Sequence, residues 1–217
     1  MLNLYAHPFS GYCQKVLVAL YENATPFNFR LVGPDEKIKA ELHSHWPLGK
    51  FPVLVDEGRV LIESSIIIEH LNLHHRGPVP LLPQDPTAAL EVRFMDRFFD
   101  NYITTPMQKI VLDFIRPVAE RDAQGVADAH TTLKTAYGWL DNVMSRRPWA
   151  AGTEFSMADC AAGPALLYSD WVHPIEGGRT HTIAYRRKLL ARPSYARAVD
   201  EARPFRHFFP PGDPQRD

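Results

Sequence analysis

The pattern of apolar and polar residues divides the chain into two parts. In the first part, short apolar runs alternate with stretches whose apolar residues recur every three or four positions, which predicts strands alternating with helices. The strands are expected at Leu2–Ala6, Phe27–Val32, Phe51–Val55 and Arg59–Ile62, and the helices at Tyr12–Glu22, Asp35–Leu42 and Ser64–His75. The segment Asp56-Glu57-Gly58 is typical of a hairpin turn. The order βαβ, then α, then ββα therefore predicts a mixed four-stranded sheet.

The second part follows a proline-rich stretch and has no convincing strand. Residues 77–86 contain four prolines, which is incompatible with a helix and marks a boundary. Helices are expected from Pro86 to a kink or break at Pro106, at Asp122–Met144, from Ser156, at Ile183–Leu190 and at Ser194–Arg203, before an irregular strap from Pro204. We therefore predict an α/β domain over residues 1–77, a linker over 78–86 and an all-helical domain over 87–217.

Composition narrows the class of protein. The 217 residues include 24 Lys and Arg against 25 Asp and Glu, a net charge of −1, so the chain lacks the positive excess of a nucleic-acid-binding protein. No apolar run is long enough to span a bilayer, and the first residues lack the basic segment of a signal peptide. Cys13 and Cys160 lie far apart in the sequence, which favours two reduced thiols over a disulfide framework. We expect a cytoplasmic protein without nucleic-acid or membrane partners.

Three short motifs could bind a ligand. Ser10-Gly11-Tyr12-Cys13 falls between a strand and a helix, where backbone N–H groups and a hydroxyl can hold an anion, or where Ser10 simply caps the helix. In Lys50-Phe51-Pro52-Val53, a cis proline would free the Val53 backbone to pair with an extended peptide, whereas a trans proline would only open an edge strand. Glu63-Ser64 offers a cation site and an anion site side by side, or an ordinary helix N-terminus.

Two further patterns give no indication of a catalytic or metal-binding site. Ser156 and Asp159 have the spacing of a capping box, which predicts a firmly started helix. The ten histidines, including His43, His45, His74 and His75, have neither cysteine partners nor a helical carboxylate–histidine frame, so we expect no metal site.

Over nearly its whole length the sequence resembles the cytosolic glutathione transferase superfamily. The resemblance is carried by four segments, namely Pro8–Cys13, Trp46–Leu54, Leu61–Ile66 and Ala151–Asp159. It implies a thioredoxin-like N-terminal domain that binds glutathione and a helical domain that forms a pocket for a second substrate.

The resemblance also implies roles for single residues. It matches Pro52 with a cis proline, Val53 with backbone pairing to the cysteinyl unit, and Glu63 and Ser64 with the γ-glutamyl head. Lys50, beside Phe51, would contact the glycine carboxylate. Ser10 matches the thiol-activating position of serine-type classes such as zeta and theta, with Tyr12 as its first rival and Cys13 as its second.

The expected activity is conjugation of glutathione, as a thiolate, to small apolar electrophiles, a detoxification reaction. The electrophile pocket is expected to use Phe9, Met107, Ile110, Phe114 and Trp171. Two alternatives remain: a zeta-like glutathione-dependent cis–trans isomerase, and a non-catalytic glutathione-binding or scaffold protein. The resemblance further implies a homodimer.

Overall fold

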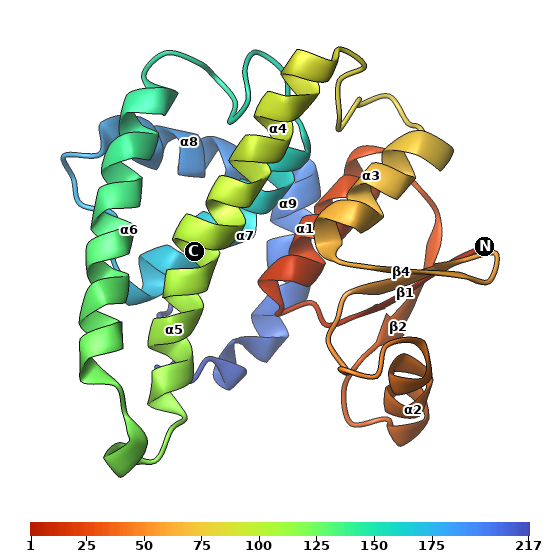
Figure 1. Ribbon diagram of the computed structural model, residues 1–217, viewed down its shortest axis with the longest axis horizontal. Helices are drawn as coiled ribbons and strands as arrows, with labels where there is room; N and C mark the ends of the chain where they lie inside the picture. The colour runs from red at the N-terminus through yellow and green to blue at the C-terminus, as the bar shows by residue number, and fades with distance from the viewer.

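The computed structural model describes all residues, 1–217, and confirms a mixed sheet followed by helices (Figure 1). The four strands lie in the order β2-β1-β3-β4, with β1 parallel to β2 and antiparallel to β3. The elements of this part are β1 (Leu2–Ala6), α1 (Gly11–Glu22), β2 (Phe27–Leu31), α2 (Glu36–His45), β3 (Val53–Asp56), β4 (Arg59–Ile62) and α3 (Ser64–His74). This is the predicted thioredoxin-like arrangement.

The β3–β4 hairpin closes through a two-residue turn. Glu57 and Gly58 both have positive φ, 47° and 86°, as a turn that matches the twist of the strands requires. The Phe51–Pro52 peptide is cis, as predicted. Strand β3 begins only at Val53, two residues later than expected, because Phe51 and Pro52 belong to the loop that precedes it.

The helical part contains six α-helices joined by short irregular or tighter turns. They are α4 (Pro86–Phe98), α5 (Thr105–Phe114), α6 (Ala123–Met144), α7 (Met157–Val172), α8 (Thr180–Leu190) and α9 (Pro193–Ala202). None of the helices combines the length and apolarity that a bilayer crossing needs. Residues 76–85 form no regular element, although Leu81 within them is fully buried.

Two expectations for this part are corrected. The first helix does not break at Pro106: it passes into a π-helical segment, η1 (Phe99–Thr104), and Pro106 lies in the first turn of α5, where proline is tolerated. The tail is not irregular from Pro204, because Arg203–Phe208 form a 3-10 helix, η3. A second 3-10 turn, η2 (Val118–Glu120), was also not predicted.

One hydrophobic core joins the two parts. Helix α1 is buried along most of its length and lies between the sheet and the helical part (Figure 1). Its residues Val16 and Leu20 share a cluster of 42 buried residues with Leu166 of α7 and Ala198 of α9. The turn between β1 and α1 is therefore held from both sides.

The capping box of α7 is present, as predicted. The Asp159 carboxylate accepts a hydrogen bond from the Ser156 N–H (2.9 Å), and it also accepts from the Ala150 N–H (2.8 Å) and the Tyr185 hydroxyl (2.5 Å). Burial raises the pKa of Asp159, and these donors oppose that shift. The motif anchors the start of a buried helix and lines neither of the clefts described below.

Candidate functional site

A polar cleft of about 290 Å³ lies where the β3 and β4 ends of the sheet meet the helical part. It is lined by Tyr12, Trp46, Lys50, Phe51, Pro52, Ile62, Glu63, Ser64, Arg97, Asp100, Asn101 and Gln108. Five of the predicted binding residues, Lys50, Phe51, Pro52, Glu63 and Ser64, therefore meet in one place. We call this the polar cleft.

Val53 lies outside the polar cleft, contrary to its predicted role. It is fully buried between β1 and β4, in register with Tyr5 on one side and Ile62 on the other. Phe51, on the other side of Pro52, lines the cleft instead. The backbone that an extended ligand could reach is therefore that of Phe51.

The N-terminus of α3 is open toward ligands. Glu63 immediately before it has a φ of 68°, a left-handed conformation that costs a non-glycine residue about 1 kcal/mol. No side chain caps the helix, so its first N–H groups keep their hydrogen-bonding capacity and the positive end of the helix dipole. Ser64 begins the helix with its side chain largely buried, whereas Glu63 is exposed. This end of α3 can hold a carboxylate.

A buried group of charges lies beneath the polar cleft. The Lys15 ammonium, only 1% exposed, is 2.6 Å from Asp96 Oδ1 and 2.9 Å from Asp100 Oδ2, and it donates a hydrogen bond to Ser65 Oγ (2.9 Å). Arg97 pairs with Asp96 from the solvent side at 2.7 Å. Burial raises the pKa of Asp100, and Lys15 opposes the shift. We call these five residues the charge cluster; it joins α1, α3, α4 and η1.

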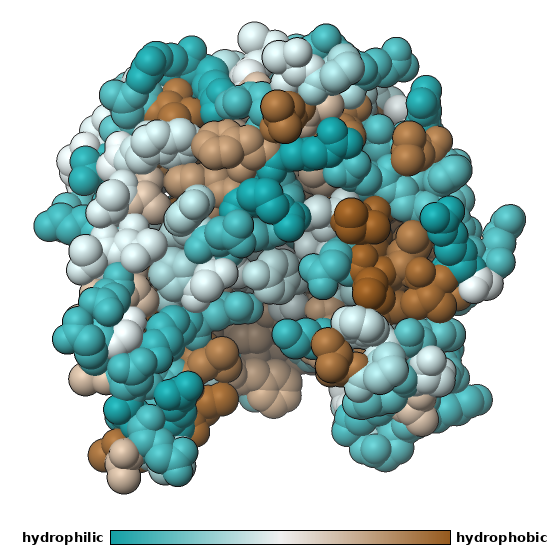
Figure 2. All heavy atoms as spheres, in the orientation of Figure 1, coloured by the Kyte–Doolittle hydropathy of each residue, from teal (hydrophilic) through white to brown (hydrophobic).

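A second, mostly apolar cleft of about 590 Å³ adjoins the polar cleft. Figure 2 shows a hollow between α5 and the region of α2 on this side of the molecule. The lining residues are Phe9, Ser10, Gly11, Tyr12, Gly49, Lys50, Phe51, Met107, Gln108, Val111, Leu112, Tyr168, Phe208, Phe209 and Pro210. Tyr12, Lys50, Phe51 and Gln108 line both clefts. We call this the apolar cleft.

Two of the five residues predicted for the electrophile pocket line the apolar cleft, namely Phe9 and Met107. The other three lie elsewhere. Ile110 is buried in the core, Phe114 is half exposed at the end of α5, and Trp171 packs behind the cleft, 5.1 Å from the ring of Phe209. The cleft faces a different stripe of α5, with Val111 and Leu112 on it, and it is completed by the tail.

The hydroxyl of Ser10 is not used to cap α1. Ser10 occupies the N-cap position, but its side chain accepts no hydrogen bond from the first turn. The residue lies at the apolar cleft, at the positive end of α1. The turn that carries it is fixed against α7, because Tyr168 donates to the Phe9 carbonyl (3.0 Å) and Gln14 donates to the Pro8 carbonyl (2.9 Å).

The two rivals of Ser10 are in different surroundings. Tyr12 is half-buried where the clefts join, and burial, with the nearby Asp100 and Glu63, raises its pKa to about 12. Its phenol is therefore a hydrogen-bond donor near neutral pH. Cys13 is fully buried and lines neither cleft. Burial raises its pKa to about 12, against hydrogen bonds from the His7 N–H and the Ser10 hydroxyl, so its thiol stays neutral.

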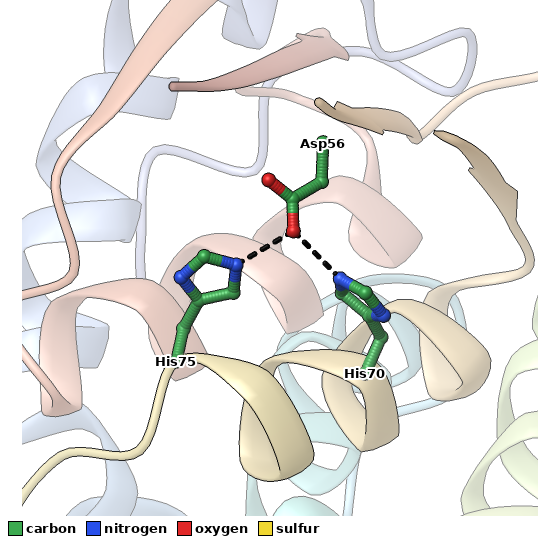
Figure 3. Close-up of side chains that lie close together, drawn as sticks. All are labelled: Asp56, His70 and His75. Carbon is green, nitrogen blue, oxygen red and sulfur yellow. Dashed lines mark hydrogen bonds and ion pairs between the residues drawn. The ribbon is translucent and has the colours of Figure 1, made fainter. Parts of the chain in front are cut away.

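Away from both clefts, Asp56, His70 and His75 come together, although the sequence predicted no metal site (Figure 3). Hydrogen bonds from His70 and then His75 lower the pKa of Asp56. His70 and His75 lie 14 and 19 positions after Asp56 along the chain. No local spacing rule could have found them.

Known proteins share this architecture. Residues 4–79 match the family model for the glutathione S-transferase N-terminal domain, and residues 98–193 match that for the C-terminal domain. A probable glutathione S-transferase of Nicotiana tabacum is 28% identical over 201 residues, 93% of this chain and 82% of the relative. FtsZ-localized protein A of Caulobacter vibrioides is 30% identical over 77% of both chains. A crystal structure of a Methylobacillus flagellatus glutathione S-transferase with GSH bound superposes with a TM-score of 0.82 at 26% identity, covering 91% of this chain and 98% of that one.

Proposed function

Because the chain belongs to the cytosolic glutathione transferase superfamily and is a glutathione transferase, we propose that it conjugates the glutathione thiolate to small apolar electrophiles. The observation that carries the proposal is the pair of adjoining clefts. One is polar and built around the open N-terminus of α3, and the other is apolar. Ser10 and Tyr12 lie beside their junction.

Glutathione fits the polar cleft as an extended tripeptide. We place its γ-glutamyl carboxylate at the Ser64 N–H and hydroxyl, and its ammonium beside Glu63. The Phe51 backbone takes the peptide-pairing role that the sequence had given to Val53. Lys50 supplies the charge for the glycine carboxylate. This placement brings the cysteinyl sulfur to the junction of the two clefts, because Phe51 lines both.

Activation requires a hydrogen-bond donor at the sulfur. A free thiol has a pKa near ~8.5, and lowering it by ~2 units corresponds to roughly 2.7 kcal/mol. A hydroxyl that donates to the thiolate supplies ~1.5–3 kcal/mol, and the end of α1 supplies ~0.3–1 kcal/mol. We assign the donor role to Ser10, which sits at the positive end of α1 and whose hydroxyl would turn from the Cys13 sulfur to that of glutathione. Tyr12 is the alternative donor.

The apolar cleft sets the class of electrophile. Its lining includes one cation, Lys50, and no acidic residue, so it suits a neutral, largely hydrophobic molecule. A zeta-like isomerase acting on a dicarboxylic substrate would need more positive charge, which disfavours that alternative. We further propose that the protein acts in the cytoplasm and in detoxification.

A non-catalytic role is the second candidate, and the similarity to FtsZ-localized protein A favours it. A relative named for where it localises has this fold, so the fold alone does not imply conjugation. Glutathione binding distinguishes a transferase from a scaffold that binds no glutathione, but not from a non-catalytic glutathione-binding protein. Glutathione at ~100 times its dissociation constant should add ~2.7 kcal/mol of stability. The absence of a thermal shift at millimolar glutathione would contradict our assignment of the polar cleft.

We also propose that the protein is a homodimer. Helices α4 and α6 form an open groove of about 470 Å³ lined by Phe94, Phe98, Tyr102 and Trp139, with three threonines and Ala136. The rings of Phe94 and Trp139 contact edge to face at 5.9 Å, and both residues are exposed in the single chain. An aromatic surface of this kind is typical of protein–protein contacts.

The test of the mechanism compares Ser10→Ala with Tyr12→Phe. If Ser10 is the donor, Ser10→Ala should leave the dissociation constant of glutathione nearly unchanged and raise the pKa of the bound thiol. The rate at neutral pH should then fall roughly 10- to 150-fold. The thiol pKa is read from the ultraviolet absorbance of the thiolate, and the rate from a panel of electrophiles. A wild-type rate in Ser10→Ala together with loss of activity in Tyr12→Phe would reassign the donor to Tyr12.

A further inference from the structure

Three side chains with metal-binding atoms meet where the β3–β4 hairpin touches the end of α3 (Figure 3). Oδ2 of Asp56 lies 2.8 Å from Nε2 of His70 and 2.7 Å from Nε2 of His75. All three ligand atoms lie within 4.8 Å of one another. None of the residues lines the polar or the apolar cleft, so the proposed conjugation leaves them unused.

The end of α3 brings the two histidines together. Were the helix to continue, residues five positions apart would point about 140° from each other around its axis. The helix instead ends at His74, and His75 adopts a non-helical φ of −131° and ψ of 51°. Its N–H still bonds to the Leu71 carbonyl at 2.8 Å, which fixes the position of the residue. The cluster is therefore built by a particular helix end against the hairpin.

The three groups already aim at one another. An ionised carboxylate only accepts, so each imidazole donates its Nε2 proton to the same oxygen of Asp56. When each proton moves to Nδ1, which is the other neutral tautomer, both Nε2 lone pairs point toward the Asp56 oxygen, and all three atoms can bind one ion once that oxygen moves back. The three side chains, which hydrogen-bond to one another in the first tautomer, can act as metal ligands in the second.

We propose that Asp56, His70 and His75 form a zinc-binding site with water as the fourth ligand. Two imidazoles and one carboxylate are a donor set that zinc favours, whereas magnesium and calcium take oxygen ligands. Tetrahedral zinc with bonds of about 2.0–2.1 Å separates its ligand atoms by about 3.3–3.4 Å. Each Asp–His pair must therefore open by about 0.6 Å, a movement within the reach of side-chain torsions.

The position of the site would allow bound zinc to stabilise the N-terminal domain. His75 is 31% exposed, so an ion can enter from solvent, while His70 at 8% anchors the site to the domain. The segment from Asp56 to His75 begins and ends at the cluster and contains Glu63 and Ser64. Zinc would close this segment into a loop and stabilise the N-terminal domain. At 100 times its dissociation constant, it should raise Tm by about 5–10 °C.

The experiment titrates zinc into the chelator-treated full chain in the absence of glutathione, whose thiol would compete. Calorimetry should find one tight site per chain, and Co²⁺ in place of zinc should give the intense visible absorption of a four-coordinate centre. Asp56→Asn and His75→Gln should each weaken zinc binding by more than about 100-fold and remove the thermal shift. Both variants should keep the metal-free circular dichroism and the metal-free conjugation rate.

The matched control is His181→Gln, which removes an exposed histidine on α8 far from the cluster. It should bind zinc as the wild type does. Three results would each overturn the proposal: unchanged zinc affinity in His75→Gln, equal loss of affinity in His181→Gln, or a weak six-coordinate spectrum with Co²⁺. Metal-free circular dichroism of each variant shows whether a loss of zinc binding follows from misfolding. His75→Gln is the variant least expected to misfold, because His75 is the more exposed of the two histidines.

Discussion

Replacing Lys15 by Met should destabilise the protein and weaken glutathione binding together. The methionine keeps most of the length and the apolar character of the lysine stem but removes the charge that lies between Asp96 and Asp100. Loss of one partner from a buried ion pair costs about 3–5 kcal/mol, because the remaining charge stays in an apolar environment. Arg97 also pairs with Asp96, so we expect the lower end, about 3 kcal/mol.

Thermal unfolding followed by circular dichroism measures this cost. For a chain of this size, 1 kcal/mol shifts Tm by about 2–4 °C, so Lys15→Met should lower Tm by about 6–12 °C. Asp100 lines the polar cleft and Ser65 follows Ser64, so the KM for glutathione should also rise, by about tenfold if 1.4 kcal/mol of binding is lost. The exposed Lys39→Met is the matched control and should change neither value appreciably.

The loss of stability in Lys15→Met should also depend on pH. Burial already raises the pKa of Asp100 in the folded protein, and loss of Lys15 should raise it further. A carboxyl whose folded pKa exceeds its unfolded value near 3.8 favours folding when protonated, and this contribution is lost as pH rises through the folded pKa. The difference in Tm between wild type and Lys15→Met should therefore be smaller at pH 4.5 than at pH 7. A variant that unfolds within 1 °C of wild type at both pH values would refute the proposed role of the charge cluster.

Three further outcomes are expected. Asp159→Ala leaves four buried donors without their acceptor and should lower the urea-unfolding free energy by about 3 kcal/mol or more, whereas the exposed Asp128→Ala should leave it within about 0.5 kcal/mol. Trp139→Ala should convert the proposed dimer into a 24.7 kDa species in light scattering at micromolar concentration, and a wild type that is already monomeric would disprove the dimer. Phe209→Ala opens the apolar cleft and should raise the KM for apolar electrophiles several-fold without changing that for glutathione, so equal increases in both would contradict the assignment of the two clefts.

Local pattern was enough to predict the strands, the α-helices and five of the 12 residues that line the polar cleft. The strands and helices follow from periodicities of two and 3.6 residues, and the hairpin and the capping box follow from short motifs. Lys50, Phe51 and Pro52 are consecutive, as are Glu63 and Ser64, so the fold places the residues of each group together. Val53 at the start of β3 pairs with Ile62 at the end of β4. Once this pairing is known, the group that precedes β3 and the group that follows β4 must meet.

Features that depend on distant packing were missed. Lys15 interrupts an apolar helix face, which reads as a solvent-exposed position until Asp96 and Asp100 are placed above it. The π-helical segment changes the register after α4, and no residue pattern in the sequence marks it. The Asp56–His70–His75 cluster and the lining of the apolar cleft by Phe208 and Phe209 likewise join residues whose separation in the sequence carries no periodic signal.

The division of the two clefts between the two parts of the chain has a mechanistic consequence. The polar cleft draws its binding groups from the β3–β4 region and α3, whereas α5, α7 and the tail form much of the apolar cleft. Under the proposed assignment of the clefts, we therefore expect substitutions on α5 or the tail to change electrophile preference while the glutathione contacts remain. Ser10 and Tyr12 lie on the one turn that both parts hold in place, through Tyr168 of α7 on one side and the sheet on the other. In the proposed mechanism, thiol activation therefore depends on the correct docking of the two parts, because a shift of α7 that moves this turn also moves the proposed donor relative to the sulfur.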